Sequence, residues 1–217
     1  MKARHLGSAL LLVCACTITA AQQRNINFDL LQAVRSGSEA SVRDLLDQGA
    51  SPNTRNRLGD TPLNSAARNG NLAMARLLLE RGADVNLANL ARVTPLMSAA
   101  FGGHADIVKL LLEAKADLRP ADRVDKTAMI YAAGNGNAEC VQALLAAGID
   151  VNARYAHDAT ALMWAAAYGK DENVRLLLSR GADPSVRDDR GESALSIAQQ
   201  EKHSGTVALL QAAVAGK

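Results

Sequence analysis

The chain has 217 residues, with 24 Lys and Arg against 22 Asp and Glu, and a formal net charge of +2. A balance this close to neutral does not indicate a nucleic-acid-binding or anionic-membrane-binding surface, so we expect neither kind of partner. Aromatic residues make up only 3% of the chain while alanine and leucine are abundant, which favours helices that approach closely through small side chains.

Residues 1–21 have the composition of a secretory signal peptide. Lys2 and Arg4 make a basic start, residues 6–20 are an apolar run, and small residues precede Gln22. A membrane anchor would need about 20 apolar residues, so that alternative is not favoured. We predict cleavage after Ala21 and export, most simply to the periplasm of a Gram-negative bacterium, with secretion as an alternative.

A lipid anchor is a second alternative for this segment, because "VCAC" loosely resembles a bacterial lipobox and would leave Cys16 lipidated. Removal of Lys2 and Arg4 from the 24 basic residues leaves 22, equal to the 22 acidic ones. The mature chain, residues 22–217, is therefore predicted to be neutral and not to be inserted in a membrane.

The mature chain repeats itself with a period of 33 residues. The period connects Thr61, Thr94, Thr127, Thr160 and Ser193, and one step back from Thr61 reaches Phe28. Alanines and glycines follow the same step, for example Ala66 and Ala99. A register held over six copies is typical of a stacked repeat array.

Each unit is predicted to fold as helix, turn, helix and loop. Thr61 is a suitable N-cap, and Pro62 stands at the first helical position, where a missing N–H costs nothing. Gly70 ends this short helix by adopting a left-handed conformation. A second helix is expected over about residues 72–80, and Gly82 closes it.

The stretch "TPLMSAAFGGHADIVKLLLEAKADL", which starts at Thr94, resembles the ankyrin repeat. The resemblance implies an all-α solenoid of stacked antiparallel helix pairs with β-hairpin or turn fingers. It divides residues 22–217 into six repeats, with an N-terminal cap, four full repeats and a C-terminal cap, at residues 26–60, 61–93, 94–126, 127–159, 160–192 and 193–217. At these ends Asp44 and Gln211 replace leucines of the interior, as capping repeats require.

Several residues depart from the family pattern. The histidine that the family places after "TPL" is replaced by Asn64, Met97, Ile130, Met163 and Ser196, so its hydrogen bonds must be replaced or lost. Lys115 replaces the second glycine, and a left-handed non-glycine residue costs about 1 kcal/mol. Because Arg119 and Pro120 then interrupt the usual pattern, we expect the finger that leads into the third full repeat to be the least regular.

No catalytic or metal-binding constellation is predicted. The histidines of the mature chain, His104, His157 and His203, lie in three different repeats, and His104 occupies a structural position of the family. Cys140 stands at a core position equivalent to Ile107, so we expect a buried thiol rather than a nucleophile. No phosphate-binding glycine motif is present. We therefore expect no enzyme activity and no cofactor.

The resemblance also implies a partner-binding surface on the concave face, which consists of the finger tips and the exposed side of each first helix. Five of the six aromatic residues fall between Phe101 and Tyr168, and aromatic and arginine side chains often anchor interfaces. The alternative for Tyr131 and Trp164 is that they only fill gaps between helices. The predicted partner-binding residues are Arg57, Arg68, Asn69, Leu90, Val93, Phe101, Arg123, Lys126, Tyr131, Asn135, Tyr155, His157, Trp164 and Tyr168.

The leading functional hypothesis is a monomeric, non-enzymatic scaffold of the bacterial cell envelope that binds another protein. One alternative is an accessory factor that protects or assembles an envelope enzyme in stress defence. Another is a secreted effector that acts on a host or rival protein. No residue of the chain selects between these roles.

Overall fold

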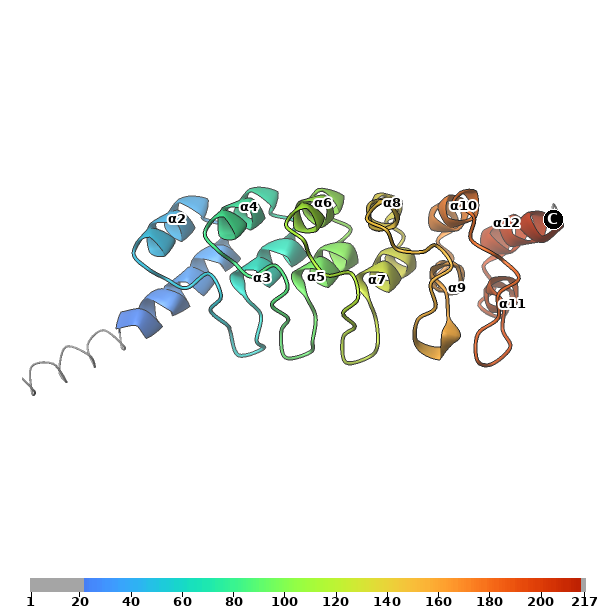
Figure 1. Cartoon of the computed structure of the whole chain (residues 1–217), viewed down its shortest axis with the longest axis horizontal. Coiled ribbons are helices and arrows are strands. Elements are labelled where there is room, and N and C mark those ends of the chain that lie inside the picture. Colours follow the sequence, from blue (N-terminus) through green and yellow to red (C-terminus); the bar gives the residue numbers. More distant parts are fainter. Residues whose placement is uncertain (1–21, 216–217) are drawn as a thin grey trace, which may run out of the picture.

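The computed structural model describes residues 22–215; the predicted signal peptide and the alternative lipid anchor at Cys16 lie outside the described residues. The described chain is one row of helix pairs, with a finger-like loop between successive pairs (Figure 1). From the second pair to the last, each first helix packs against the first helix of the next pair. The all-α repeat stack predicted from the 33-residue period is therefore confirmed.

Each helix pair has a first helix, on the finger side of the row, and a second helix behind it. The N-terminal pair consists of a helix over residues 22–36 and α2 (Glu39–Asp47). The four central pairs are α3 (Pro62–Asn69) with α4 (Leu72–Glu80), α5 (Pro95–Gly102) with α6 (Ala105–Glu113), α7 (Ala128–Asn135) with α8 (Ala138–Ala146), and α9 (Ala161–Ala167) with α10 (Asp171–Ser179). The last pair is α11 (Ala194–Gln200) with α12 (Ser204–Ala215), and a 3-10 turn, η1 (Ala156–Asp158), lies in one finger.

The ends of α3 follow from local chemistry. Thr61 Oγ1 accepts a hydrogen bond from the Asn64 N–H at 3.1 Å, and Asn64 Oδ1 accepts one from the Thr61 N–H at 3.1 Å. Gly70 ends the helix with a φ of 74°. A Cβ on Gly70 would lie 2.5 Å from the ring of His104, so the turn needs glycine for space as well as for conformation.

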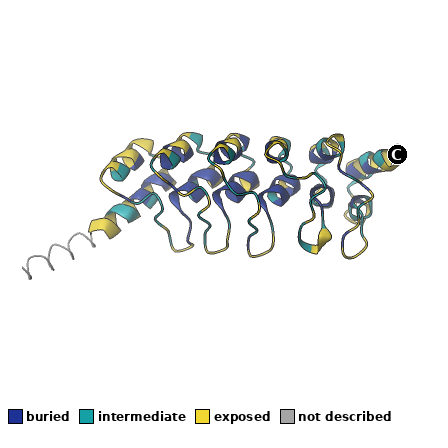
Figure 2. Ribbon diagram, in the orientation of Figure 1, coloured by how far each residue is buried: buried dark blue, intermediate teal, exposed yellow. Residues whose placement is uncertain are grey.

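The first helices carry the deepest part of the core, drawn dark blue in Figure 2. The period places Ala66, Ala99, Ala132 and Ala165 where neighbouring first helices meet, and each is at most 1% exposed. Their methyl groups let the helices pack closely, so a larger side chain there would cost about 1–3 kcal/mol. Behind them, leucines such as Leu78 and Leu111 are fully buried between the second helices.

The fingers are held by side chains rather than by strands. Asn89 Oδ1 accepts the backbone N–H groups of Ala91 and Val93, both at 2.9 Å. The same two bonds recur at Asn56, Asp122 and Asp188. The fingers between residues 22 and 215 contain no β-strand, and only one isolated bridge occurs, between Arg187 and Ser193, in the finger that Asp188 holds. Of the two finger forms expected, turns are found and β-hairpins are not.

The prediction of the least regular finger was wrong. The finger at residues 117–126 keeps both Asp122 bonds, and Lys115 adopts a left-handed φ of 68°. This finger loses the turn hydrogen bond that Leu87 donates to Asp84 one period earlier, because Pro120 has no N–H. The irregular finger is at residues 150–159, where Tyr155 occupies the place of Asp122. A phenol cannot accept two backbone N–H bonds in this geometry, and the finger instead forms η1 with His157 at a φ of 59°.

The lost "TPL" histidines are replaced unevenly. Asn64 not only caps α3 but also donates from Nδ2 to the Val93 carbonyl at 3.2 Å, which links two repeats. Ser196 Oγ accepts from the Ser193 N–H at 2.8 Å. Met97 and Ile130 are buried and apolar, so their side chains cannot donate a hydrogen bond to the neighbouring repeat as Asn64 does. Near the ends, Asp44 and Gln211 are exposed, whereas Leu77 and Leu110 inside the row are buried.

Candidate functional site

The candidate site is a row of aromatic side chains along the concave face, between α5 and α9. The Phe101 and Tyr131 rings meet edge to face with centroids 5.5 Å apart, and the Trp164 and Tyr168 rings stack at 6.2 Å. Lys126 Nζ bridges the two pairs, at 5.8 Å from the Tyr131 ring and 5.1 Å from the Trp164 ring. We call these five residues the aromatic strip.

The repeat geometry explains why distant residues meet here. Tyr131 and Trp164 are one period apart, so each stands on the same turn of its first helix and faces the same way. Lys126 comes from the end of the finger between them. Gly134 is buried beside Tyr168, and a Cβ there would lie 3.3 Å from the Tyr168 ring. Glycine at this point lets Tyr168 lie against the preceding repeat.

The strip has an exposed part and an anchored part. Phe101 is 56% exposed and Tyr168 is 50% exposed, although both rings rest against a neighbouring ring. Tyr131 and Trp164 are half-buried, and they pack against the core as well as line the face. Neither of the two interpretations left open for Tyr131 and Trp164 therefore excludes the other.

The Tyr131 hydroxyl donates a hydrogen bond to Asp122 Oδ2. Burial and the adjacent Asp122 carboxylate raise the pKa of Tyr131, so its hydroxyl stays protonated. Trp164 has no comparable bond, because its buried Nε1 has no hydrogen-bond partner. Tyr131 is therefore the ring whose orientation is fixed by a polar contact.

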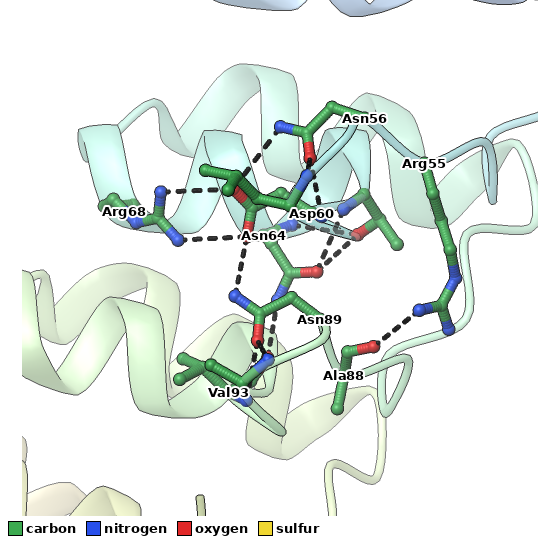
Figure 3. A network of polar contacts seen from close by, with 11 residues as sticks. Arg55, Asn56, Asp60, Asn64, Arg68, Ala88, Asn89 and Val93 are labelled. Carbon is green, nitrogen blue, oxygen red and sulfur yellow. Dashed lines mark hydrogen bonds and ion pairs between the residues drawn. The ribbon is translucent and has the colours of Figure 1, made fainter. Parts of the chain in front are cut away.

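The arginine at one flank is already committed within the fold, as Figure 3 shows. Arg68 donates from both terminal nitrogens to the buried Asp60 carboxylate, at 3.4 and 3.1 Å, and Asn89 donates to the same group at 2.7 Å. Burial raises the Asp60 pKa, but the bonds from Asn89 and Arg68 outweigh it and leave the pKa below 3.8. Arg68 is therefore a structural residue first, although its side chain is partly exposed.

Several other predicted residues lie away from the strip or hold the fold. Val93 and Tyr155 are half-buried against the core, so Val93 is not the exposed apolar residue that its position suggested. Burial raises the pKa of Tyr155 to about 12. Asn135 donates to the Phe101 carbonyl at 2.7 Å, and exposed His157 contacts Asp189 through Nδ1 at 3.0 Å. Arg57, Asn69, Leu90 and Arg123 are exposed.

Two hollows lie at the ends of this face. The C-terminal hollow, of about 380 Å³, lies beside Trp164 and is also lined by His157, Asp188, Arg190 and Glu201. The N-terminal hollow, of about 630 Å³, is lined by Arg24, Phe28, Leu31, Arg35, Arg55, Arg57 and Leu58, among others. Of the residues named for the N-terminal hollow, only Arg57 is among the predicted partner-binding residues, whereas Trp164 and His157 of the C-terminal hollow both are.

The period of the sequence could have identified Arg24 and Arg35 as residues of this face. Arg57 and Arg68 lie four residues before and seven after Thr61, and Leu90 and Phe101 hold the same places around Thr94. Phe28 stands where the N-terminal cap would have that threonine, and the same offsets from Phe28 give Arg24 and Arg35. The surface around Arg24 and Arg35 was missed because the N-terminal cap has Phe28 in place of the repeated threonine, although the 33-residue period predicts this surface.

The described residues show little sign of other chemistry. Between residues 22 and 215, no group of His, Cys, Asp and Glu side chains is arranged to hold a metal ion. No helix in that range has the length and apolar character to cross a membrane. Cys140 is fully buried, and burial, with a smaller effect of Glu139, raises its thiol pKa to about 12. His104 and His203 each contact a carbonyl of the preceding repeat through Nε2, at 3.1 Å.

Comparison with known proteins agrees with this architecture. A family model described as ankyrin repeats (3 copies) matches residues 30–122, 88–155, 116–188 and 154–215. No curated protein matches the chain. Members of this family generally act as protein–protein interaction modules and are typically not enzymes. Because the overlapping matches span nearly all the described residues, the chain belongs to the ankyrin-repeat family.

Proposed function

We propose that this protein is a monomeric, non-enzymatic scaffold that holds a partner protein on its concave face, with the aromatic strip as the main contact. The observation that carries the proposal is the exposure of Phe101 and Tyr168 within an otherwise ordered row of rings. Exposed aromatic side chains gathered on one face are common at protein interfaces.

The strip is well suited to binding because its side chains are held in place before any partner arrives. Tyr131 is fixed by Asp122, Phe101 rests on Tyr131, and Tyr168 stacks on Trp164. Side chains that are ordered in advance lose less conformational entropy on association. Lys126 adds a positive charge at the centre, half-buried between two rings, which favours a partner with an acceptor group opposite it.

We also propose that the protein works in the bacterial cell envelope. The support is the composition of residues 1–21, with a basic start, an apolar run and small residues before Gln22. Mass spectrometry of the mature N-terminus tests the location. A chain that begins at Gln22 supports a cleaved signal, a lipid on Cys16 replaces it with a lipid anchor, and an intact N-terminus contradicts export.

The binding proposal is tested by crosslinking in living cells followed by capture of the tagged chain. We compare the wild type, the double variant Phe101→Ala/Tyr168→Ala, and the control Val214→Ala, which removes an exposed apolar side chain on α12. If each ring is a main contact, the double variant loses its partner, because a central aromatic contributes about 2 kcal/mol or more. Equal recovery of the same partners by all three proteins contradicts the assigned face.

A further inference from the structure

The N-terminal hollow and the C-terminal hollow are the same place in the repeat, four periods apart. Gln32 occupies the position of Trp164, and Arg35 occupies that of Ala167. The aromatic strip fills the face between them. The two ends of one surface therefore use equivalent repeat positions and carry different side chains.

The N-terminal hollow has one sign of charge. Arg24, Arg35, Arg55 and Arg57 line it, and no Asp or Glu is among its lining residues. None of these four guanidinium groups forms an ion pair with another described residue. Arg55 donates to the Ala88 carbonyl at 3.0 Å and so ties two fingers together, while the other three have no such bond in the described chain.

Apolar side chains lie among these charges. Phe28 is 59% exposed and Leu58 is 67% exposed, and the half-buried Leu31 also lines the hollow. Large apolar side chains that are this exposed, in a recess of about 630 Å³, are suited to receive an apolar group. The hollow therefore combines exposed apolar side chains with guanidinium groups that form no ion pair within the described chain.

We propose that this hollow binds an acidic segment of the partner protein, in which carboxylates flank a large apolar side chain. This inference rests on the proposed function and adds the chemistry of the partner. Guanidinium groups bind carboxylates through paired N–H donors, and Phe28, Leu31 and Leu58 cover the apolar side chain. Charge complementarity then sets the direction in which the partner lies along the concave face.

A nucleic acid fits the same surface less well. Its phosphates repeat along the whole strand, but the arginine cluster is confined to one end of the face. At the other end the charge is mixed, because exposed Glu201 lies in the C-terminal hollow with Arg190, whose guanidinium already pairs with the buried Asp188. A phosphate backbone would also make no favourable contact with the apolar side chains of Phe28, Leu31 and Leu58. A polypeptide is therefore the occupant that the surface favours.

The test is selection of random peptides displayed on phage against the immobilised full chain. We expect the wild type to enrich peptides in which Asp or Glu flanks Phe, Leu or another large apolar residue. The variant Arg35→Glu/Arg57→Glu reverses two charges of the hollow and leaves Arg55 in place. It should bind the selected peptides at least about tenfold more weakly, because each reversal exchanges an attraction for a repulsion.

The matched control is Arg43→Glu/Arg76→Glu, which makes the same change in net charge on the exposed sides of α2 and α4. This control should bind the selected peptides as the wild type does. The milder Arg35→Gln/Arg57→Gln should show a smaller loss, and it keeps the test valid if the charge-reversed variant does not fold by circular dichroism.

Three results of the peptide experiment overturn the inference. One is a selection without acidic enrichment, another is equal binding by the hollow and control variants, and the third is a single-stranded oligonucleotide that displaces the selected peptide at equal concentration. The result for the aromatic strip separates this inference from the proposed function. If Phe101→Ala/Tyr168→Ala loses its cellular partner while the hollow variants keep it, the scaffold function stands and only the acidic segment is rejected.

Discussion

One carboxylate ties a finger to the aromatic strip: Tyr131 donates its hydroxyl hydrogen to Asp122 Oδ2. Oδ1 of the same group accepts the backbone N–H groups of Val124 and Lys126, at 2.9 and 3.0 Å. Burial raises the Asp122 pKa, but the Tyr131 bond and the backbone bonds outweigh it and leave the pKa below 3.8. The charged carboxylate therefore positions both a ring and a turn.

Replacing Tyr131 with Phe should lower the free energy of unfolding by about 1–3 kcal/mol, because the carboxylate loses a hydrogen bond while it remains buried. Asp122→Ala should cost more, since it also leaves the N–H groups of the finger without their acceptor. Urea unfolding of the full chain measures both changes.

Tyr168→Phe is the control for this prediction. Its hydroxyl is on a ring that is 50% exposed, so the same chemical change should alter the unfolding free energy by less than about 0.5 kcal/mol. Equal effects at Tyr131 and Tyr168 would show that the Asp122 contact contributes nothing particular to stability.

Stability should fall in acid because of Asp60 and Asp122. Both have a folded-state pKa below the ordinary 3.8, so their contribution is fully present above that value. It is lost as the pH falls from 3.8 through the lower folded-state pKa values, where the native carboxylates take up protons. Thermal unfolding from neutral pH down through this range should show the melting temperature fall most steeply below 3.8.

The variant Asp122→Asn tests the cause of this acid effect. Asn89 performs the same finger-holding role one period earlier, so the substitution keeps an acceptor for the backbone N–H groups and removes only the titrating charge. Its melting temperature should depend less on pH than that of the wild type. An unchanged acid slope would assign the effect to other groups.

The sequence predicted correctly those features that depend only on residues within one repeat. The N-cap at Thr61, the left-handed Gly70 and the second helix at Leu72–Glu80 all appear as predicted, because neighbouring residues in the chain determine them. The core position of Cys140 also follows from the period alone.

Contacts between repeats were harder to foresee. The approach of Lys126 to both Tyr131 and Trp164 depends on how far one repeat is shifted and rotated against the next, and the period does not give that geometry. The irregular finger was misplaced for a related reason. Tyr155 removes the acceptor that Asn56, Asn89, Asp122 and Asp188 supply in the other fingers, and this loss distorts the chain more than Pro120 does.

Trp164 gives a direct optical signal from the strip because it is the only tryptophan of the chain. Tyr168 stacks on it at 6.2 Å, so Tyr168→Ala should expose the indole, move its emission to longer wavelength and increase quenching by acrylamide. Phe101→Ala should leave the emission unchanged, since Phe101 contacts Tyr131 at the other side of the strip. The same shift in both variants would contradict the arrangement of the rings.

Cys140 should report on the opening of the stack. Its side chain is fully buried and burial raises its pKa to about 12, so almost no thiolate is available to an alkylating reagent at neutral pH. We expect iodoacetamide to label the native protein far more slowly than the protein in denaturant, with a rate that rises in the destabilised Tyr131→Phe variant. Mass spectrometry of Cys140 peptides measures this rate, with free cysteine as the reference. Labelling of the native chain as fast as free cysteine would mean that α8 does not stay packed between α6 and α10, and that the row of repeats is open at its centre.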